Sequence, residues 1–203
     1  MRGGLISKVN KTIYFGKRRF YKEFRIAKLL NNKGVPTLKP LAVVTRRVFG
    51  PFYRGAFLTY YESGYQPLAF TFQRYFHERL IKMASNLVLK IHDLGIEHKD
   101  LNLNNILVRK ISQNFSLLII DFDRASIQKK PLSSLKRSLA LFRIYRSATR
   151  ILGKEKAIKF IKVFFMEYRN NLPLKLQNQQ AIIIKLLKPL KNIQYFCADL
   201  FRV

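Results

Sequence analysis

Four polar residues in the middle of the chain have the types and the spacing that phosphoryl transfer requires. His98, Asp100 and Asn105 stand in one segment, and Asp121 follows a second, apolar segment. A phosphoryl group is transferred when the attacking hydroxyl is held in line and magnesium neutralises the charge on the phosphates. Asp100 is expected to accept or orient the hydroxyl proton. Asn105 and Asp121 are expected to supply the hard oxygen ligands that Mg²⁺ requires.

Asp and Asn are also common turn formers, so a hairpin with polar turns is the alternative interpretation. Ile106 to Val108 and Ser116 to Ile120 are short apolar runs that predict a buried hairpin. Both functional ends of such a hairpin would emerge on one side. A plain hairpin does not explain why the four polar residues occur together, so we favour the catalytic interpretation.

The residue pattern around these positions is typical of kinases. Residues 98–105 match the catalytic-loop pattern H-x-D-L-x-x-x-N, and residues 121–122 begin like the metal-binding motif D-F-G. In more detail, His98 to Leu107 resembles the H-x-D-L-N-x-x-N-I-L motif of the Kdo/WaaP lipopolysaccharide kinase family. Ile120 to Arg124 resembles the I-D-F-D-[KR] motif of the same family.

Two departures from protein kinases favour this sugar-kinase family. Asn102 stands where eukaryotic protein kinases usually have Lys, and Asp123 stands where they have Gly. Weaker matches extend the likeness to most of the chain, with the Kdo kinases as the most similar group. Arg2 to Leu5 resembles the family's R-G-G-L motif. Phe20 to Glu23 resembles its first large helix, and Leu135 to Leu139 resembles its R-S-L region.

The resemblance implies an α+β, protein-kinase-like two-lobed fold with a truncated N-terminal lobe and a mainly helical C-terminal lobe. Residues 1–62 would form the N-lobe remnant, and residues 63–203 the C-lobe with the catalytic loop and the metal motif. The implied cofactors are ATP and Mg²⁺. The implied reaction phosphorylates a sugar hydroxyl, of Kdo or of heptose, in the lipopolysaccharide inner core, with a Kdo-lipid A precursor as substrate. His98 would support the catalytic loop from beneath.

The same resemblance suggests where the nucleotide binds. Glu23 lies beside the apolar face of a helix predicted over residues 17–32, where kinases place the Glu that pairs with a phosphate-binding Lys or Arg. A solvated helix charge is the alternative for Glu23. Tyr60, Tyr61 and Glu62 stand where a hinge between lobes would meet adenine, and a strand end followed by a turn is the alternative there.

The phosphate side of the expected site is incomplete in this sequence. No G-x-G-x-x-G occurs in the 16 residues before the Glu23 helix. Lys8 and Lys11 are candidate substitutes for the strand-borne cation, although neither stands on a convincing strand. We therefore expect weak ATP binding, and an inactive pseudokinase acting as a membrane-surface binding module is the alternative function.

The net charge of the chain indicates which partners and which location to expect. The chain has 39 Lys and Arg against 11 Asp and Glu, a formal net charge of +28. This composition favours anionic lipid and phosphorylated glycolipid; nucleic acid is not expected, because no recognised binding motif accompanies the charge. There is no uninterrupted apolar run of roughly 18 residues, no secretory signal, and a single cysteine, Cys197. We expect a peripheral protein on the cytoplasmic face of the inner membrane.

The remaining elements are predicted from hydrophobic spacing and from turn residues. Gly50-Pro51 is expected to turn the chain between two strands, and Gly95 to close a long helix. The predicted strands are Leu41 to Phe49 and Gly55 to Tyr61, and the predicted helices are Ala69 to Leu94, Ser133 to Leu152, Lys154 to Asn170 and Asn178 to Phe196.

Overall fold

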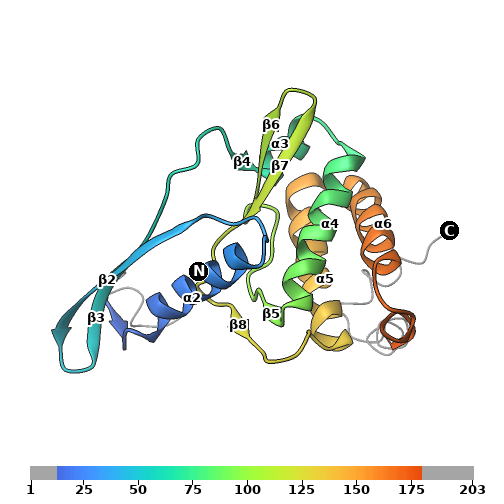
Figure 1. Cartoon of the computed structure of the whole chain (residues 1–203). Coiled ribbons are helices and arrows are strands. Elements are labelled where there is room, and N and C mark those ends of the chain that lie inside the picture. Colours follow the sequence, from blue (N-terminus) through green and yellow to red (C-terminus); the bar gives the residue numbers. More distant parts are fainter. Residues whose placement is uncertain (1–12, 180–203) are drawn as a thin grey trace.

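The computed structural model describes residues 13–179 of the chain (Figure 1). Arg2 to Leu5, Lys8, Lys11, Cys197 and nearly all of the helix predicted over residues 178–196 lie outside the described residues.

The first part of the described chain is one helix packed on a small antiparallel sheet. Helix α2 (Arg18–Asn32) follows β1 (Tyr14–Phe15), and β2 (Pro40–Phe49) and β3 (Phe52–Thr59) form a long hairpin. The strand order is β1-β3-β2. The helix fits the sheet closely, because a Cβ atom on Gly55 would lie 2.9 Å from the Phe20 ring. The predicted helix, turn and hairpin are present, but β3 begins before Gly55 and ends before Tyr60.

The second part is mainly helical. Its helices are α3 (Leu68–Arg74), α4 (Glu78–Asp93), α5 (Ser134–Leu152) and α6 (Lys154–Asn170), and its strands are β4 (Gln66–Pro67), β5 (Ile96–Glu97), β6 (Ile106–Ile111), β7 (Asn114–Ile119) and β8 (Ser126–Ile127). Strands β4, β6 and β7 form one sheet, and β5 pairs with β8. Figure 1 shows the β2–β3 hairpin and the α4–α5–α6 group at opposite ends of the molecule. The predicted α+β class is confirmed, whereas a lobe boundary between residues 62 and 63 stays a prediction.

Helices α4, α5 and α6 enclose the apolar core. The apolar face predicted for α4 is buried over its whole length: Leu80, Ala84, Leu87, Val88 and Ile91 are at most 5% exposed. Burial of such side chains stabilises a fold by roughly 1.5–3 kcal/mol each. The core therefore provides a rigid support for the segments that leave α4 and β7.

The prediction of a single long helix over residues 69–94 is wrong. The chain is extended at Tyr75 and again at His77, which separates α3 from α4. Consecutive aromatic residues are weaker helix formers than Ala or Leu. Here His77 also makes a tertiary contact, because its ring packs on Phe115 of β7. This contact favours the break over a continuous helix.

A buried polar network joins the C-terminal end of α4 to α5 and α6. The Arg137 guanidinium, 1% exposed, donates to Asp93 Oδ1 at 2.7 Å, to Tyr168 Oη at 3.0 Å and to the Leu132 carbonyl at 2.8 Å. Tyr168 Oη also lies 2.7 Å from His92 Nδ1. Buried charges of this kind need such partners, so the network fixes the point at which the chain leaves α4.

Gly95 makes the turn from α4 into the catalytic loop, and its substitution should be unusually costly. Its φ is +72°, and a Cβ atom would lie 2.5 Å from each of the Gln128 and Lys130 carbonyl oxygens. Gly34 has φ +66° with nothing within 4 Å, so Gly34→Ala is the matched control. We expect Gly34→Ala to cost about 1–2 kcal/mol of unfolding free energy. Gly95→Ala should cost about 1–3 kcal/mol more. Equal urea midpoints for the two variants would contradict this packing.

Candidate active site

The backbone of Ile120 connects the two predicted motifs. Its N–H donates to the Asn105 carbonyl at 2.9 Å. Its carbonyl accepts a hydrogen bond from His98 Nε2, also at 2.9 Å. Asp121 follows directly, so these two bonds set the metal motif beside the catalytic loop. The predicted meeting of His98, Asn105 and Asp121 is therefore present in the structure.

His98 supports the loop as a neutral, buried side chain. Its ring is 1% exposed and packs against Phe122, with the ring centroids 5.1 Å apart. Burial lowers its pKa, while the hydrogen bond to Ile120 and the charges of Asp121 and Asp100 act in the opposite direction. Because a carbonyl only accepts, Nε2 carries the proton. His98 is thus a positioning residue for both carboxylates.

Side-chain amides order the catalytic loop around Asp100. The Asp100 carbonyl accepts from Asn102 Nδ2 at 3.0 Å and from Asn105 Nδ2 at 2.9 Å. Asn102 Oδ1 in turn accepts the N–H groups of Asn104 and Asn105. The Asp100 carboxylate itself is exposed. The loop is therefore held from within, and its one acidic group faces outward.

Asp121 and Asn105 fit a magnesium ion. The Asn105 amide nitrogen is used in the bond to Asp100, so its oxygen Oδ1 is the atom left to bind a ligand. Asp121 is exposed and has φ +65°, a conformation that Asp and Asn adopt more readily than other non-glycine residues. Among residues 13–179 there is no group of three or more His, Cys, Asp or Glu that could hold a metal. Phosphate and water oxygens would complete the shell, which suits Mg²⁺.

Helix α2 reaches the metal motif through two successive turns. Arg19 forms a two-point ion pair with Asp123, through Nε and Nη2. One turn later, the Glu23 carboxylate accepts the Phe122 N–H. The Thr37 hydroxyl adds a third link, donating at 2.6 Å to the carbonyl of Ile119. The position of α2 is therefore coupled to the position of Asp121.

Glu23 is the most strongly perturbed acid at this place. Burial, first, and then the charges of Asp123 and Asp121 raise its pKa to about 7. The hydrogen bond from Phe122 and the charge of Arg19 lower it, but by less. A second cation beside Glu23 would lower this pKa. Within the described residues, Arg19 pairs with Asp123 instead.

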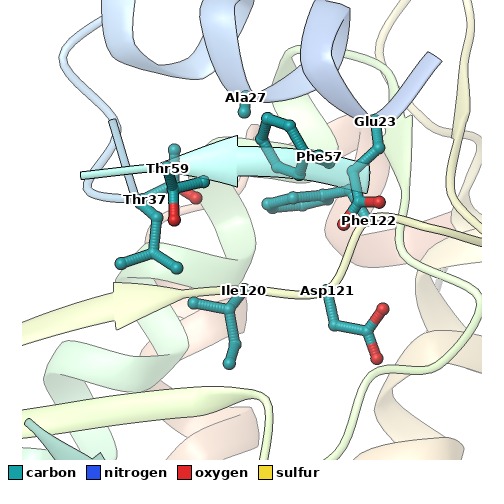
Figure 2. Close-up of a pocket in the computed structure, with 9 residues that line it drawn as sticks. Glu23, Ala27, Thr37, Phe57, Thr59, Ile120, Asp121 and Phe122 are labelled. Carbon is teal, nitrogen blue, oxygen red and sulfur yellow. The ribbon is translucent and has the colours of Figure 1, made fainter. Parts of the chain in front are cut away.

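A cleft of about 210 Å³ lies between α2, β3 and the segment Ile120–Phe122. Figure 2 shows Glu23 reaching from α2 toward Phe122, while the Asp121 carboxylate points away from the helix. The lining combines a few polar groups with apolar walls, as small-molecule sites do. The lining residues are Glu23, Ala27, Thr37, Leu38, Phe57, Thr59, Ile120, Asp121 and Phe122.

The three hinge candidates lie just beyond this cleft. Thr59 lines it, whereas Tyr60, Tyr61 and Glu62 follow and do not. Tyr61 is 90% exposed, and Tyr60 has the Lys39 ammonium 5.2 Å from its ring. Glu62 lies 3.9 Å from Arg109 on β6. A role in nucleotide binding stays a prediction for these three.

Sequence reasoning missed three residues that organise the site. The sequence pattern identifies Asn102 only as a position that differs from protein kinases. The spacing N-x-N-N within a loop is itself a signal for amide hydrogen bonds. Arg19 and Thr37 gave no local signal, because their partners are 104 and 82 residues away.

The arrangement defines a class of protein: an α+β fold of the protein-kinase type, in which the segment Ile120–Phe122 lines a cleft and is joined by hydrogen bonds to the loop of residues 98–105. The chain belongs to the lipopolysaccharide kinase (Kdo/WaaP) family, whose model matches residues 1–164. A solved structure described as WaaP in complex with acyl carrier protein shares the fold, with a TM-score of 0.64 at 20% identity over 94% of this chain and 79% of that one.

Similarity to curated proteins supports the same family assignment. The chain is 33% identical over 157 residues to 3-deoxy-D-manno-octulosonic acid kinase of Xylella fastidiosa (strain 9a5c), covering 75% of this chain and 61% of that protein. It is 30% identical over 148 residues to the protein of the same name from Actinobacillus succinogenes, covering 68% and 62%. The chain thus spans about three fifths of the length of these relatives.

The raised pKa of Glu23 predicts a stability effect with a definite sign. The folded state binds more protons than the unfolded state between pH 4.5 and about 7. The stabilisation is therefore full below pH 4.5 and is lost as the pH rises through 7. We expect Glu23→Gln to be more stable than the wild type at pH 8 by about 1 kcal/mol, because solvent screens a half-buried group. At pH 5 the difference should shrink.

Thermal unfolding at both pH values measures this effect, and a difference of about 2–4 °C is expected at pH 8. Glu155→Gln on the exposed side of α6 is the control and should show no pH-dependent difference. A Glu23→Gln variant that is equally destabilised at pH 5 and pH 8 would contradict the assigned environment.

Proposed function

We propose that the protein catalyses ATP-dependent phosphorylation of a sugar hydroxyl in the lipopolysaccharide inner core, with Mg²⁺ as cofactor. The observation that carries the proposal is the pair of hydrogen bonds on Ile120, which join the segment of Asp121 to Asn105 and to His98. Asp100 lies in the same loop as these two residues, and Ile120 and Asp121 line the cleft. The relatives named 3-deoxy-D-manno-octulosonic acid kinase support Kdo as the acceptor, in a Kdo-lipid A precursor. Heptose is the alternative acceptor.

Each site residue has its own role in the proposed reaction. The sugar oxygen forms a bond to the γ-phosphorus of ATP, the bond from that phosphorus to the bridging oxygen breaks, and ADP leaves. Asp100 takes the hydroxyl proton, while Asn102 and Asn105 hold its backbone in place. Asn105 Oδ1 and the Asp121 carboxylate would hold Mg²⁺, which neutralises charge on the phosphates when bound. His98 keeps both carboxylates in register.

We also propose that the protein works at the cytoplasmic face of the inner membrane, as a peripheral protein. The net charge of +28 supports attraction to anionic lipid, where each basic residue near the surface contributes about 1 kcal/mol. Within residues 13–179, no helix has the length and apolar character needed to cross a membrane. The acceptor sugar would be presented there on its lipid.

One observation favours a second candidate function, an inactive pseudokinase that binds the membrane surface. Glu23 forms no ion pair with Lys or Arg in the described part of the chain, and the nearby Arg19 pairs with Asp123. A kinase whose Glu has no cation would bind the phosphates of ATP weakly. Calorimetry of Mg·ATP binding to residues 1–203 separates the two: no binding supports the pseudokinase.

Substitution of the two acidic site residues tests the kinase proposal. Asp100→Asn and Asp121→Asn should each lower phosphate transfer from labelled ATP to Kdo-lipid A by at least about 100-fold, since general-base catalysis alone contributes roughly 10²–10⁴. Both side chains are exposed, so the unfolding midpoint should change little. Glu155→Gln makes the same chemical change on α6 and should keep full activity. Near-normal turnover by Asp100→Asn would refute the role of Asp100 as the base.

A further inference from the structure

Acidic residues are almost absent from the first part of the chain. Glu23 is the only Asp or Glu before Glu62, and it faces the cleft. Between these two acids lie the β2–β3 hairpin and its flanks, which carry Lys39, Arg46, Arg47 and Arg54. The positive charge of this hairpin is therefore not balanced along the chain.

Two of these arginines are placed directly opposite each other. Arg46 on β2 pairs in register with Arg54 on β3, and both are exposed. Like charges at directly opposed positions destabilise a sheet. Neither arginine forms an ion pair within residues 13–179, whereas Arg47 donates to the Gly50 carbonyl at 2.7 Å. An anion bound from outside would remove the repulsion.

Apolar side chains surround the arginine pair. Val44 and Leu58 are 55% and 41% exposed on the face that carries Arg46 and Arg54. Val44 pairs with Ala56 at the next position of this face, and Leu58 pairs with Ala42 at the position after that. At the tip, Val48 is 41% and Phe49 59% exposed, and the Phe49 ring packs on Phe52 at 4.7 Å. Basic residues next to exposed aromatic and aliphatic ones are typical of surfaces that lie in a membrane interface.

The position of the hairpin suits such a surface. Figure 1 shows it extending beyond α2, away from the α4–α5–α6 group. Strand β3 begins at Phe52 in the tip and reaches the cleft at Phe57 and Thr59. At about 3.3 Å per residue, the tip lies roughly 20 Å from the cleft. A bilayer at the tip would leave the cleft within reach of a sugar carried on a lipid.

We propose that the hairpin surface, formed by Val44, Arg46, Val48, Phe49, Arg54 and Leu58, binds an anionic lipid bilayer. The arginines contact lipid phosphates, and Phe49 inserts among the head groups and upper acyl chains. This inference rests on the membrane association proposed above and names the surface responsible. It is independent of whether the chain transfers phosphate.

The absence of tryptophan from the chain allows a direct test. Phe49→Trp places one tryptophan at the proposed insertion point. Ile111→Trp places one at the β6–β7 hairpin, where Ile111 is 48% exposed, and serves as the matched control. Vesicles of phosphatidylglycerol and phosphatidylethanolamine should shift the emission of Phe49→Trp to the blue and make it quenchable by brominated acyl chains. Ile111→Trp should not respond, and neither variant should respond to phosphatidylcholine vesicles.

Charge removal tests the arginine pair by co-sedimentation with the same anionic vesicles. Arg46→Ser/Arg54→Ser should weaken partitioning about 30-fold, since each basic residue near the surface is worth about fivefold. Lys110→Ser/Lys129→Ser removes the same charge from exposed positions elsewhere and should weaken partitioning into the vesicles much less. Circular dichroism of each variant checks the fold. Equal losses for the two double variants would overturn the inference.

The remaining outcomes separate this inference from the proposed function. Salt-sensitive vesicle binding without a Phe49→Trp shift would overturn the hairpin surface and leave the membrane association standing. No binding to anionic vesicles would overturn both, while the phosphate-transfer assay would still decide the enzymatic proposal. An equal blue shift with soluble polyglutamate would assign the surface to an acidic protein and overturn the lipid assignment.

Discussion

Both backbone polar groups of Ile120 are hydrogen-bonded: its N–H donates to the Asn105 carbonyl, and its carbonyl accepts from the neutral ring of His98. The site depends on this constraint, because Asp121 follows Ile120 directly; the packing of the His98 ring on Phe122 supports the same segment from the other side of Asp121. Ile119 is held in turn by the segment after α2, through Thr37 and the Pro36 carbonyl. A few consecutive backbone groups thus join the sheet part, the catalytic loop and the metal motif. The buried core under His98 and Phe122 makes these bonds rigid.

Charge explains how the two parts meet across the cleft. Arg19 and Glu23 lie one turn apart on α2, and both contact the segment that carries Asp121. Three carboxylates gather there with one close guanidinium, so an added cation is favoured electrostatically. The +28 charge elsewhere attracts anionic partners. The proposed transfer of phosphate to an anionic glycolipid with Mg²⁺ would use this arrangement, in which a cluster of carboxylates lies within a positively charged molecule.

The sequence predicted the parts of the fold that local patterns determine. The apolar face of α4, the turn at Gly50 and the meeting of His98, Asn105 and Asp121 follow from periodicity, turn chemistry and motif spacing. The break between α3 and α4 was not predicted, because aromatic contacts with distant residues outweigh helical spacing. The Arg19–Asp123 pair was not predicted either, since nothing near Arg19 indicates a partner 104 residues away.

In the proposed function, one metal–nucleotide complex binds against both Asn105 and Asp121, and paramagnetic NMR with Mn²⁺·ATP tests this binding most directly. Manganese should broaden the Asn105 side-chain amide and the Asp121 and Phe122 backbone amides first. The β6–β7 tip around Lys110 should stay sharp, and Mg²⁺·ATP should broaden none of these signals. Asp121→Asn should need much more Mn²⁺·ATP for the same effect. Broadening centred elsewhere, or none at millimolar Mn²⁺·ATP, would contradict the account.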